Sequence, residues 1–250
     1  MREALLNMRA RWWLLIIWIC FLLRGWFYAS MLPLWEGYDE FAHFGVIRAA
    51  ALHGVPLAPR DQMGPRDVEE SLKLVPIPWG VRTWEVFRAA VTHEQFWRLP
   101  ESERRDREAR LRAMPRAWQW QESDRISAYE ALQPPLYYWL MAPVLYVLKG
   151  SGLLAQTVAL RWISVVIASL AIPIVFVVAL NVSRRKPVAL GCAAVVSAMP
   201  EFAANAARIS NEPVAIALFS LLAWAGLRLL LRKPDLGAAL GLGAVLGLGL

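Results

Sequence analysis

The fold class is decided by residues 162–180, which read WISVVIASLAIPIVFVVAL and contain no charged side chain. A helix needs about 20 largely apolar residues to cross a hydrocarbon core about 30 Å thick, because each residue adds about 1.5 Å. Arg184, Arg185 and Lys186 follow directly, and basic residues beside a span favour the cytoplasmic side. The stretch therefore predicts a transmembrane helix.

Three more stretches predict spans, at residues 12–34, 188–207 and 213–231. A fifth run, 236–250, is still apolar at the last residue, as expected of a helix bundle truncated at its C-terminal end. Residues 1–30 are alternatively a cleaved signal peptide. The bulky aromatic side chains after Arg24 are unlike the small residues of a cleavage region, so an uncleaved first span is the preferred interpretation.

Composition and charge agree with a membrane protein. Hydrophobic residues make up 58% and charged residues 19% of the chain, against about 45–50% and 25% in soluble domains. Residues 33–133 hold 14 basic and 16 acidic side chains, so the net charge of +7 comes from basic residues beside the apolar runs. This distribution fits the positive-inside rule and argues against a nucleic-acid partner.

The apolar run 134–148 is only 15 residues long, about 22 Å as a helix and too short for an ordinary span. If it does not cross, nine of the twelve basic residues that flank the spans lie on the side of the N-terminus; if it crosses, six lie on each side. The rule therefore favours a helix in the outer interface, a cytoplasmic N-terminus and a large outer loop. Aromatic side chains suited to that level are Tyr137, Tyr138, Trp139 and Tyr146.

The resulting fold is an all-α polytopic bundle with amphipathic juxtamembrane helices in its first extracytoplasmic loop. Its parts are a first transmembrane helix (1–34), the loop (35–156) and a transmembrane bundle (157–250). Apolar periodicity and turn residues predict loop helices over 39–53, stopped by Gly54, over 82–98 and over 100–114. These helices either rest on the outer leaflet or pack into a small domain with its own core.

Few residues carry obvious chemistry. Cys20 and Cys192 lie in apolar runs and are expected to be packing residues. Asp39 and His43 are four residues apart and would share one face of a helix, where one could orient the other or both could bind a divalent cation. Asp39 is alternatively a simple N-cap of that helix.

Ionisable residues near the predicted spans form the second group of candidates. Glu201, Arg208 and Glu212 flank the outer turn between two spans, and such residues usually face a cavity or pair with one another. Arg208 and Glu212 are alternatively a plain salt bridge. Arg24, halfway along the first span, costs about 2.5–3.5 kcal/mol at a helix centre, so it is expected to face the bundle interior or to snorkel.

Three patches together resemble the GT-C class of membrane glycosyltransferases, especially the aminoarabinose transferase and protein mannosyltransferase-like group. They are residues 39–44 (DEFAHF), 129–139 (YEALQPPLYYW) and 207–213 (ARISNEP). The chain departs from the family in length, being less than half as long, and at Gln133, where many members have His or a charged residue.

The resemblance implies an inverting enzyme of the bacterial inner membrane that takes a sugar from a polyprenyl-phosphate donor. The acceptor would be a lipid, a polysaccharide or a protein on the outer side. Asp39 would be the general base or would orient the acceptor nucleophile, and Glu212 would be the second catalytic carboxylate. The residues that would bind substrate are Glu40, His43, Arg208, Tyr137 and Tyr138.

A divalent metal fits the same resemblance, with Asp39, His43 and Glu212 as its ligands. Oxygen ligands favour Mg²⁺ or Mn²⁺, and the imidazole would allow Zn²⁺. Two other classes stay open: a transporter or lipid-handling protein, with Arg24, Glu201 and Glu212 along a pathway, and a non-catalytic relative whose loop helices bind a partner.

Overall fold

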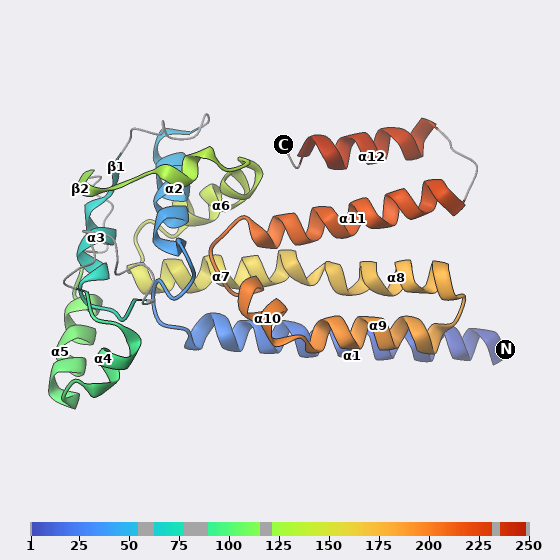
Figure 1. Cartoon of the computed structure of the whole chain (residues 1–250), viewed down its shortest axis with the longest axis horizontal. Coiled ribbons are helices and arrows are strands. Elements are labelled where there is room, and N and C mark those ends of the chain that lie inside the picture. The colour runs from blue at the N-terminus through green and yellow to red at the C-terminus, as the bar shows by residue number, and fades with distance from the viewer. Residues whose placement is uncertain (1, 55–62, 78–89, 116–121, 232–235, 249–250) are drawn as a thin grey trace. The chain divides into compact units, whose positions relative to one another are not determined.

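The computed structural model describes residues 2–54, 63–77, 90–115, 122–231 and 236–248, and it is mostly helical (Figure 1). The chain divides into two compact units. We call one the helix unit, made of Met1–Ser30, Arg161–Ala207 and Asn211–Leu250. We call the other the loop unit, made of Met31–Leu160 and Arg208–Ser210.

Long apolar helices build the helix unit. They are α1 (Arg2–Met31), α7 (Leu153–Ser169), α8 (Ala171–Ser183), α9 (Lys186–Ala198), α10 (Pro200–Ala206), α11 (Glu212–Leu231) and α12 (Leu236–Leu248). Helix α8 packs against α9 and α11, and α12 packs against α11 (Figure 1). Both α1 and α7 continue into the loop unit at one end.

Among the described residues, three helical segments are long and apolar enough to cross a membrane: Met8–Met31, Leu153–Ser183 and Glu212–Leu231. They contain or closely match three of the predicted spans. A fourth candidate is the pair α9 and α10, which is bent by 62°. The prediction of one continuous helix over 188–207 is therefore wrong. Met199 is extended (φ −62°, ψ 119°), because the residue before a proline, here Pro200, is pushed out of the helical region.

Close contacts join α1 to its neighbours within the helix unit. A Cβ atom on Gly25 would lie 2.5 Å from Val165 Cγ1, so only glycine allows this approach of α1 to α7. The Phe21 ring stacks on Phe202 with centroids 4.7 Å apart. Arg24 donates hydrogen bonds to the carbonyl oxygens of Ser197, Ala198 and Met199 at the end of α9. The arginine faces the bundle, as expected from the cost of exposing it to lipid.

Shorter elements build the loop unit. They are α2 (Glu40–His53), β1 (Met63–Pro65), α3 (Arg66–Leu72), α4 (His93–Arg98), α5 (Glu101–Arg112), β2 (Glu122–Ser127), the 3₁₀ helix η3 (Tyr129–Leu132) and α6 (Leu136–Val147). The two strands pair antiparallel, with Met63 opposite Ser127 and an irregular register toward Pro65. This ribbon was missed by the all-α prediction, because a three-residue strand has no periodicity to detect.

The loop unit has a core of its own. Helix α2 packs against α6 and η3, and the fully buried side chains there include Phe44, Tyr138 and Met141. The indole of Trp35 is also buried and donates a hydrogen bond of 2.7 Å to Ser71 Oγ. Of the two alternatives for the loop helices, this core favours a small packed domain.

Two of the three predicted loop helices are present, and the third is not a continuous helix. Helix α2 lies within 39–53 and ends before Gly54, whose φ of 78° suits glycine, and α5 lies within 100–114. A continuous helix over 82–98 is wrong: residues 78–89 lie outside the described part of the chain, residues 90–92 are not helical, and α4 starts at His93. Thr92 starts α4 by forming a capping box with Gln95.

Candidate active site

A strained turn holds Asp39 at the start of α2. Asp39 has φ 57° and Trp35, four residues earlier, has φ 63°; this left-handed region is uncommon for residues other than glycine, although Asp tolerates it better than most. Asp39 occupies the N-cap position, but its side chain makes no capping hydrogen bond. Its Oδ1 instead accepts a hydrogen bond of 2.7 Å from the Tyr129 hydroxyl. The simple N-cap alternative therefore does not account for this carboxylate.

The neighbouring Glu40 has a different environment. Its side chain is 0% exposed, Oε1 accepts a hydrogen bond of 3.0 Å from the Ile209 backbone N–H, and Oε2 accepts one of 3.3 Å from Gly37 N–H. The carboxylate thus ties the turn before α2 to the segment Arg208–Ser210, which belongs to the same unit. Glu40, predicted to bind substrate, lies in the interior as a structural link.

Arg208 lies beside this turn. A Cβ atom on Gly37 would come within 3.2 Å of Arg208 Cγ, so the arginine stem packs directly on the glycine. The side chain is half-buried. Its Nε is buried and has no hydrogen-bond partner among the described residues. Such an arginine, packed against Gly37 in the turn before α2, has a donor left for an anionic group.

The short helix η3 brings a second set of polar groups to α2. Tyr138 donates its hydroxyl proton to the Glu130 carbonyl oxygen at 3.0 Å, and its oxygen lies 2.9 Å from His43 Nδ1. Because a tyrosine has one proton to donate, the bond with His43 requires the proton on Nδ1. The other ring nitrogen, Nε2, then faces Glu130 Oε2 at 3.7 Å, which is too long for a hydrogen bond.

Burial sets the protonation of this cluster. It lowers the pKa of His43 to about 4, so the imidazole is neutral at pH 7. It raises the pKa of the Glu130 carboxyl, and the negative charge of Asp39 raises it further, while a hydrogen bond from Gln133 acts in the opposite direction. The pKa of Tyr129 is raised by burial and by its hydrogen bond to Asp39, so its hydroxyl remains a donor. The site therefore pairs a neutral imidazole with a carboxyl that resists ionisation, beside Asp39.

Three distant stretches of sequence meet around this cluster in the loop unit. Asp39, Glu40 and His43 come from the first, Tyr129, Glu130 and Tyr138 from the second, and Arg208 and Ile209 from the third. Asp39 Oδ2 accepts no hydrogen bond from the described residues, and the side chain is half-buried. A carboxylate fixed through one oxygen, with the other oxygen open, can accept a proton from a bound molecule.

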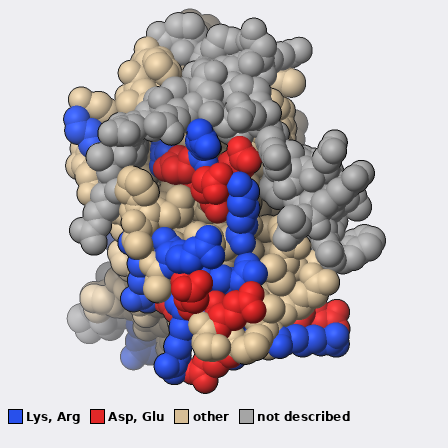
Figure 2. All heavy atoms as spheres, turned by 90° about the vertical axis from the view of Figure 1, so that its left-hand side faces the viewer, with Lys and Arg blue, Asp and Glu red and all other residues tan. Residues whose placement is uncertain are grey.

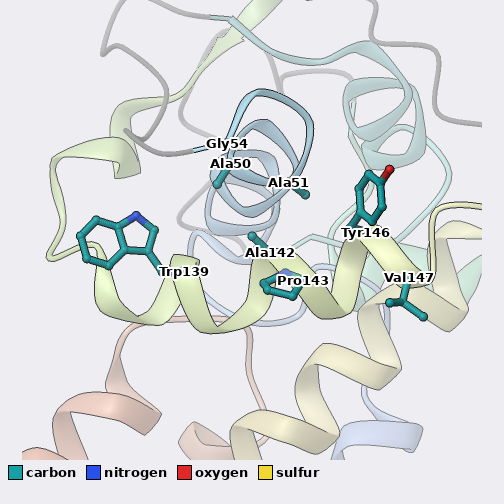
Figure 3. A pocket seen from close by; sticks show the side chains of 8 residues that line it. All are labelled: Ala50, Ala51, Gly54, Trp139, Ala142, Pro143, Tyr146 and Val147. Carbon is teal, nitrogen blue, oxygen red and sulfur yellow. The ribbon is translucent and has the colours of Figure 1, made fainter.

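Tyr137 and Tyr138, expected at the membrane interface and in substrate binding, are interior residues. Tyr137 and Tyr138 are 1% and 0% exposed, whereas Trp139 and Tyr146 of the same helix are almost half exposed. These two aromatic side chains flank a groove of about 690 Å³ between the C-terminal end of α2 and α6. Figure 3 shows Pro143 and Ala142 at its floor, below Ala50 and Ala51 of α2. The exposed aromatic side chains of α6 are therefore Trp139 and Tyr146.

The remaining predicted residues lie in the helix unit. Glu212 is exposed and begins α11, and Glu201 lies in the first turn of α10. A meeting of Glu212 with Asp39, which belongs to the loop unit, stays a prediction.

A divalent metal held by Asp39, His43 and Glu212 stays a prediction, because Glu212 belongs to the other unit. In the described part of the chain, no group of three or more His, Cys, Asp or Glu side chains has the arrangement of a metal site. The His43 nitrogens face Tyr138 and Glu130, and Asp39 Oδ1 is taken by Tyr129. No step proposed below depends on a metal.

Sequence reasoning missed Tyr129 and Glu130 as site residues. Both stand at the start of the patch YEALQPPLYYW, five and four residues before Pro134. Their order before a Pro-Pro pair is the only available signal, because contact with Asp39 spans 90 residues of sequence. Comparison of the chain with protein-family models, curated protein sequences and solved structures gives no match.

Proposed function

We propose that this protein is an inverting glycosyltransferase that moves a sugar from a polyprenyl-phosphate donor to an acceptor at the outer face of a membrane. The observation that supports it most is the convergence of the three patches that resemble GT-C enzymes. Residues 39–44, 129–139 and 208–210 contribute to one cluster. Three candidate spans would anchor the chain in the membrane, where such a lipid-linked donor is dissolved.

Asp39 is the general base of the proposed reaction. Its open oxygen, Oδ2, takes the proton from the hydroxyl or amine of the acceptor as that group attacks the anomeric carbon. A new bond forms between the acceptor and the sugar, the bond between the sugar and the phosphate oxygen breaks, and polyprenyl phosphate leaves from the opposite face. Tyr129 is a positioning residue that holds the carboxylate through Oδ1.

Arg208 stabilises the leaving phosphate, because a guanidinium matches two phosphate oxygens and its stem is fixed against Gly37. Glu212 is the second carboxylate and helps to orient the acceptor. Glu130, whose pKa is raised by burial, stays protonated more readily than a surface carboxyl and limits the negative charge near the donor.

The proposed location is a bacterial inner membrane, with the N-terminus in the cytoplasm and the loop unit outside. The basic residues Arg184, Arg185 and Lys186, between α8 and α9, support this orientation. Alkaline phosphatase fused after residue 115 should be active, and after residue 184 inactive. The reverse pattern would exclude an outer site.

Transfer is tested with the complete chain in proteoliposomes. The donors are polyprenyl phosphates that carry radiolabelled 4-amino-4-deoxyarabinose or mannose, and total membrane lipid supplies acceptors. Asp39→Asn should lower the rate at which labelled product and free polyprenyl phosphate form by about 10²–10⁴-fold, the usual contribution of a general base. Tyr129→Phe should lower it less, because the carboxylate remains.

The matched control is Asp106→Asn, the same substitution on the exposed surface of α5. It should leave the rate unchanged. Equal rates for Asp39→Asn and the unmodified chain would exclude Asp39 as the base. Flux of a labelled solute across the vesicles without any glycosyl product would instead favour a transporter.

A further inference from the structure

A second groove in the loop unit runs beside α5 and has a volume of about 460 Å³. One side of it is apolar, with contributions from the end of α1 and the chain after it, the turn near residue 75, α4, the last turn of α5 and the start of α7. The side chains that form this wall are Met31, Leu34, Pro76, Trp97, Leu111 and Leu154. The other side is polar and comes from α5.

Arg104 is distinctive among the arginines of α5. The other four pair with the acid four residues before them: Arg105 with Glu101, Arg107 with Glu103, Arg110 with Asp106 and Arg112 with Glu108. The residue four before Arg104 is Pro100. Glu108, four residues after Arg104, pairs with Arg112 instead, and Arg104 has no ion pair with any residue that the structure describes.

The guanidinium of Arg104 instead turns to the groove that it lines. Its Cζ lies 5.4 Å from the centroid of the Trp97 ring. Its Nε is buried and has no hydrogen-bond partner in the described part of the chain. A half-buried guanidinium with an unused donor, stacked on an indole, is suited to an anionic ligand with an apolar portion.

Two acidic and two basic side chains line the groove: Glu101, Glu108, Arg104 and Arg105. Figure 2 shows acidic and basic side chains intermixed on the face that it draws, without a broad basic patch. Glu101 and Glu108 also line the groove, but each is already paired with an arginine of α5. Recognition of an anion would therefore depend on Arg104 itself rather than on the general field of the surface.

Chain connectivity places the groove at the boundary of the membrane. Met31 is the last residue of the candidate span Met8–Met31, and Leu154 is the second residue of Leu153–Ser183. Both side chains belong to the apolar wall. At the ends of two spans, the most abundant molecule that combines a phosphate with hydrocarbon chains is a membrane phospholipid.

We infer that this groove binds one phospholipid, with its phosphate on Arg104 and the upper part of an acyl chain along Met31 and Leu154. A guanidinium donates two parallel hydrogen bonds to phosphate oxygens, and the apolar wall shields the chain from water. The bound lipid would fasten the loop unit to the outer leaflet. The inference is independent of glycosyl transfer, because none of its residues belongs to the candidate active site.

The test compares Arg104→Gln with Arg105→Gln. Both arginines line the groove on α5, but Arg105 is already neutralised by Glu101. The complete chain is purified in mild detergent and titrated with phosphatidylglycerol, and the bound lipid is counted by native mass spectrometry. Arg104→Gln should weaken binding of the tightest lipid by about tenfold or more, the usual effect of losing a charge-assisted hydrogen bond. Arg105→Gln should bind like the unmodified chain.

Competition identifies the source of the phosphate. Dihexanoyl phosphatidylglycerol should displace the bound lipid, and inorganic phosphate at the same concentration should not. Equal lipid binding by the two variants and the unmodified chain would overturn the inference, and so would equal loss in both variants. Displacement by inorganic phosphate alone would also overturn it, because the groove would then be a phosphate site without a lipid.

Discussion

Helices α2 and α5 both carry charged side chains, but most of those of α2 are buried and those of α5 are not. In α2, Glu40, His43 and Arg48 are all buried, and their partners come from distant parts of the chain, such as the Ile209 backbone. In α5 no residue is buried, and four arginines each pair with the acid four residues before them. Charged residues along a helix therefore indicate a solvent-exposed helix only when their ion-pair partners lie one turn away on the same helix.

The difference has an energetic consequence. An exposed i,i+4 ion pair contributes about 0.3–0.5 kcal/mol. A buried charged group that loses its partner costs several times more, because water no longer replaces the missing hydrogen bond. Substitutions in α2 should therefore disturb the fold far more than chemically equal substitutions in α5.

The largest effect is expected for Glu40→Ala. The substitution leaves the N–H groups of Ile209 and Gly37 without acceptors in the interior, at a cost of about 1–3 kcal/mol each. We expect the free energy of unfolding to fall by about 2–5 kcal/mol, measured by thermal denaturation in detergent. Glu108→Ala on α5 is the control and should cost under about 0.5 kcal/mol. Similar losses for the two variants would remove the distinction between the helices.

Acid should weaken α2 through His43. The imidazole has a pKa of about 4 in the folded chain and about 6.5 when unfolded, so the unfolded state binds more protons between these values. Stability is therefore lost as the pH falls from about 6.5 to 4, by about 3 kcal/mol in total.

The test compares two variants, Glu130→Gln and the double substitution His43→Gln with Glu130→Gln. The free energy of unfolding of each is measured between about pH 4 and pH 7. Both chains carry Glu130→Gln because the raised pKa of the Glu130 carboxyl changes stability with pH in the opposite direction. A carboxyl that keeps its proton longer in the folded state stabilises the fold at low pH, and this stability is lost as the pH rises. If the His43→Gln chain loses as much stability in acid as its parent, His43 is not the responsible group.

A smaller effect is expected for Tyr129→Phe, which removes only the hydroxyl that donates to Asp39. Loss of one hydrogen bond to a carboxylate at a half-buried position should lower the free energy of unfolding by about 1–2 kcal/mol. Tyr38→Phe, at an exposed position beside the same turn, serves as the control. Indistinguishable unfolding curves for the two variants would mean that the Tyr129 bond is absent in solution.

The smallest effect is expected in α5. A double-mutant cycle of Glu101→Ala and Arg105→Ala should give a coupling energy under about 0.5 kcal/mol, which shrinks further in 0.5 M salt. A coupling above about 1 kcal/mol would make α5 a structural element like α2.

Local signals in the sequence predicted much of the fold. The apolar runs predicted three candidate spans, and the acid-first charge pattern predicted α5. The break at Met199 was missed even though Pro200 stood in the run, because the length and hydropathy of that run outweighed the proline. The start of α4 was also readable, since Thr92 and Gln95 form the pattern of a capping box.

The candidate site could be predicted only in part. Asp39 and His43 were identified from their position after a span, but their partners Tyr129, Glu130 and Tyr138 lie about 90 residues later. The left-handed conformation of Asp39 was not predictable either, since a helix start normally suggests a capping aspartate. Contacts between distant residues depend on tertiary packing, which no local pattern records.

The contact between Arg24 and the end of α9 has a consequence for how the protein is made. Inserted alone, the first span carries an unpaired guanidinium, and inserted alone, the broken span carries open carbonyl groups at residues 197–199. In the described part of the chain Arg24 donates to these carbonyl groups, and more than 170 residues separate the two in the order of synthesis. The first helix therefore gains these hydrogen bonds only after residues 197–199 have been synthesised.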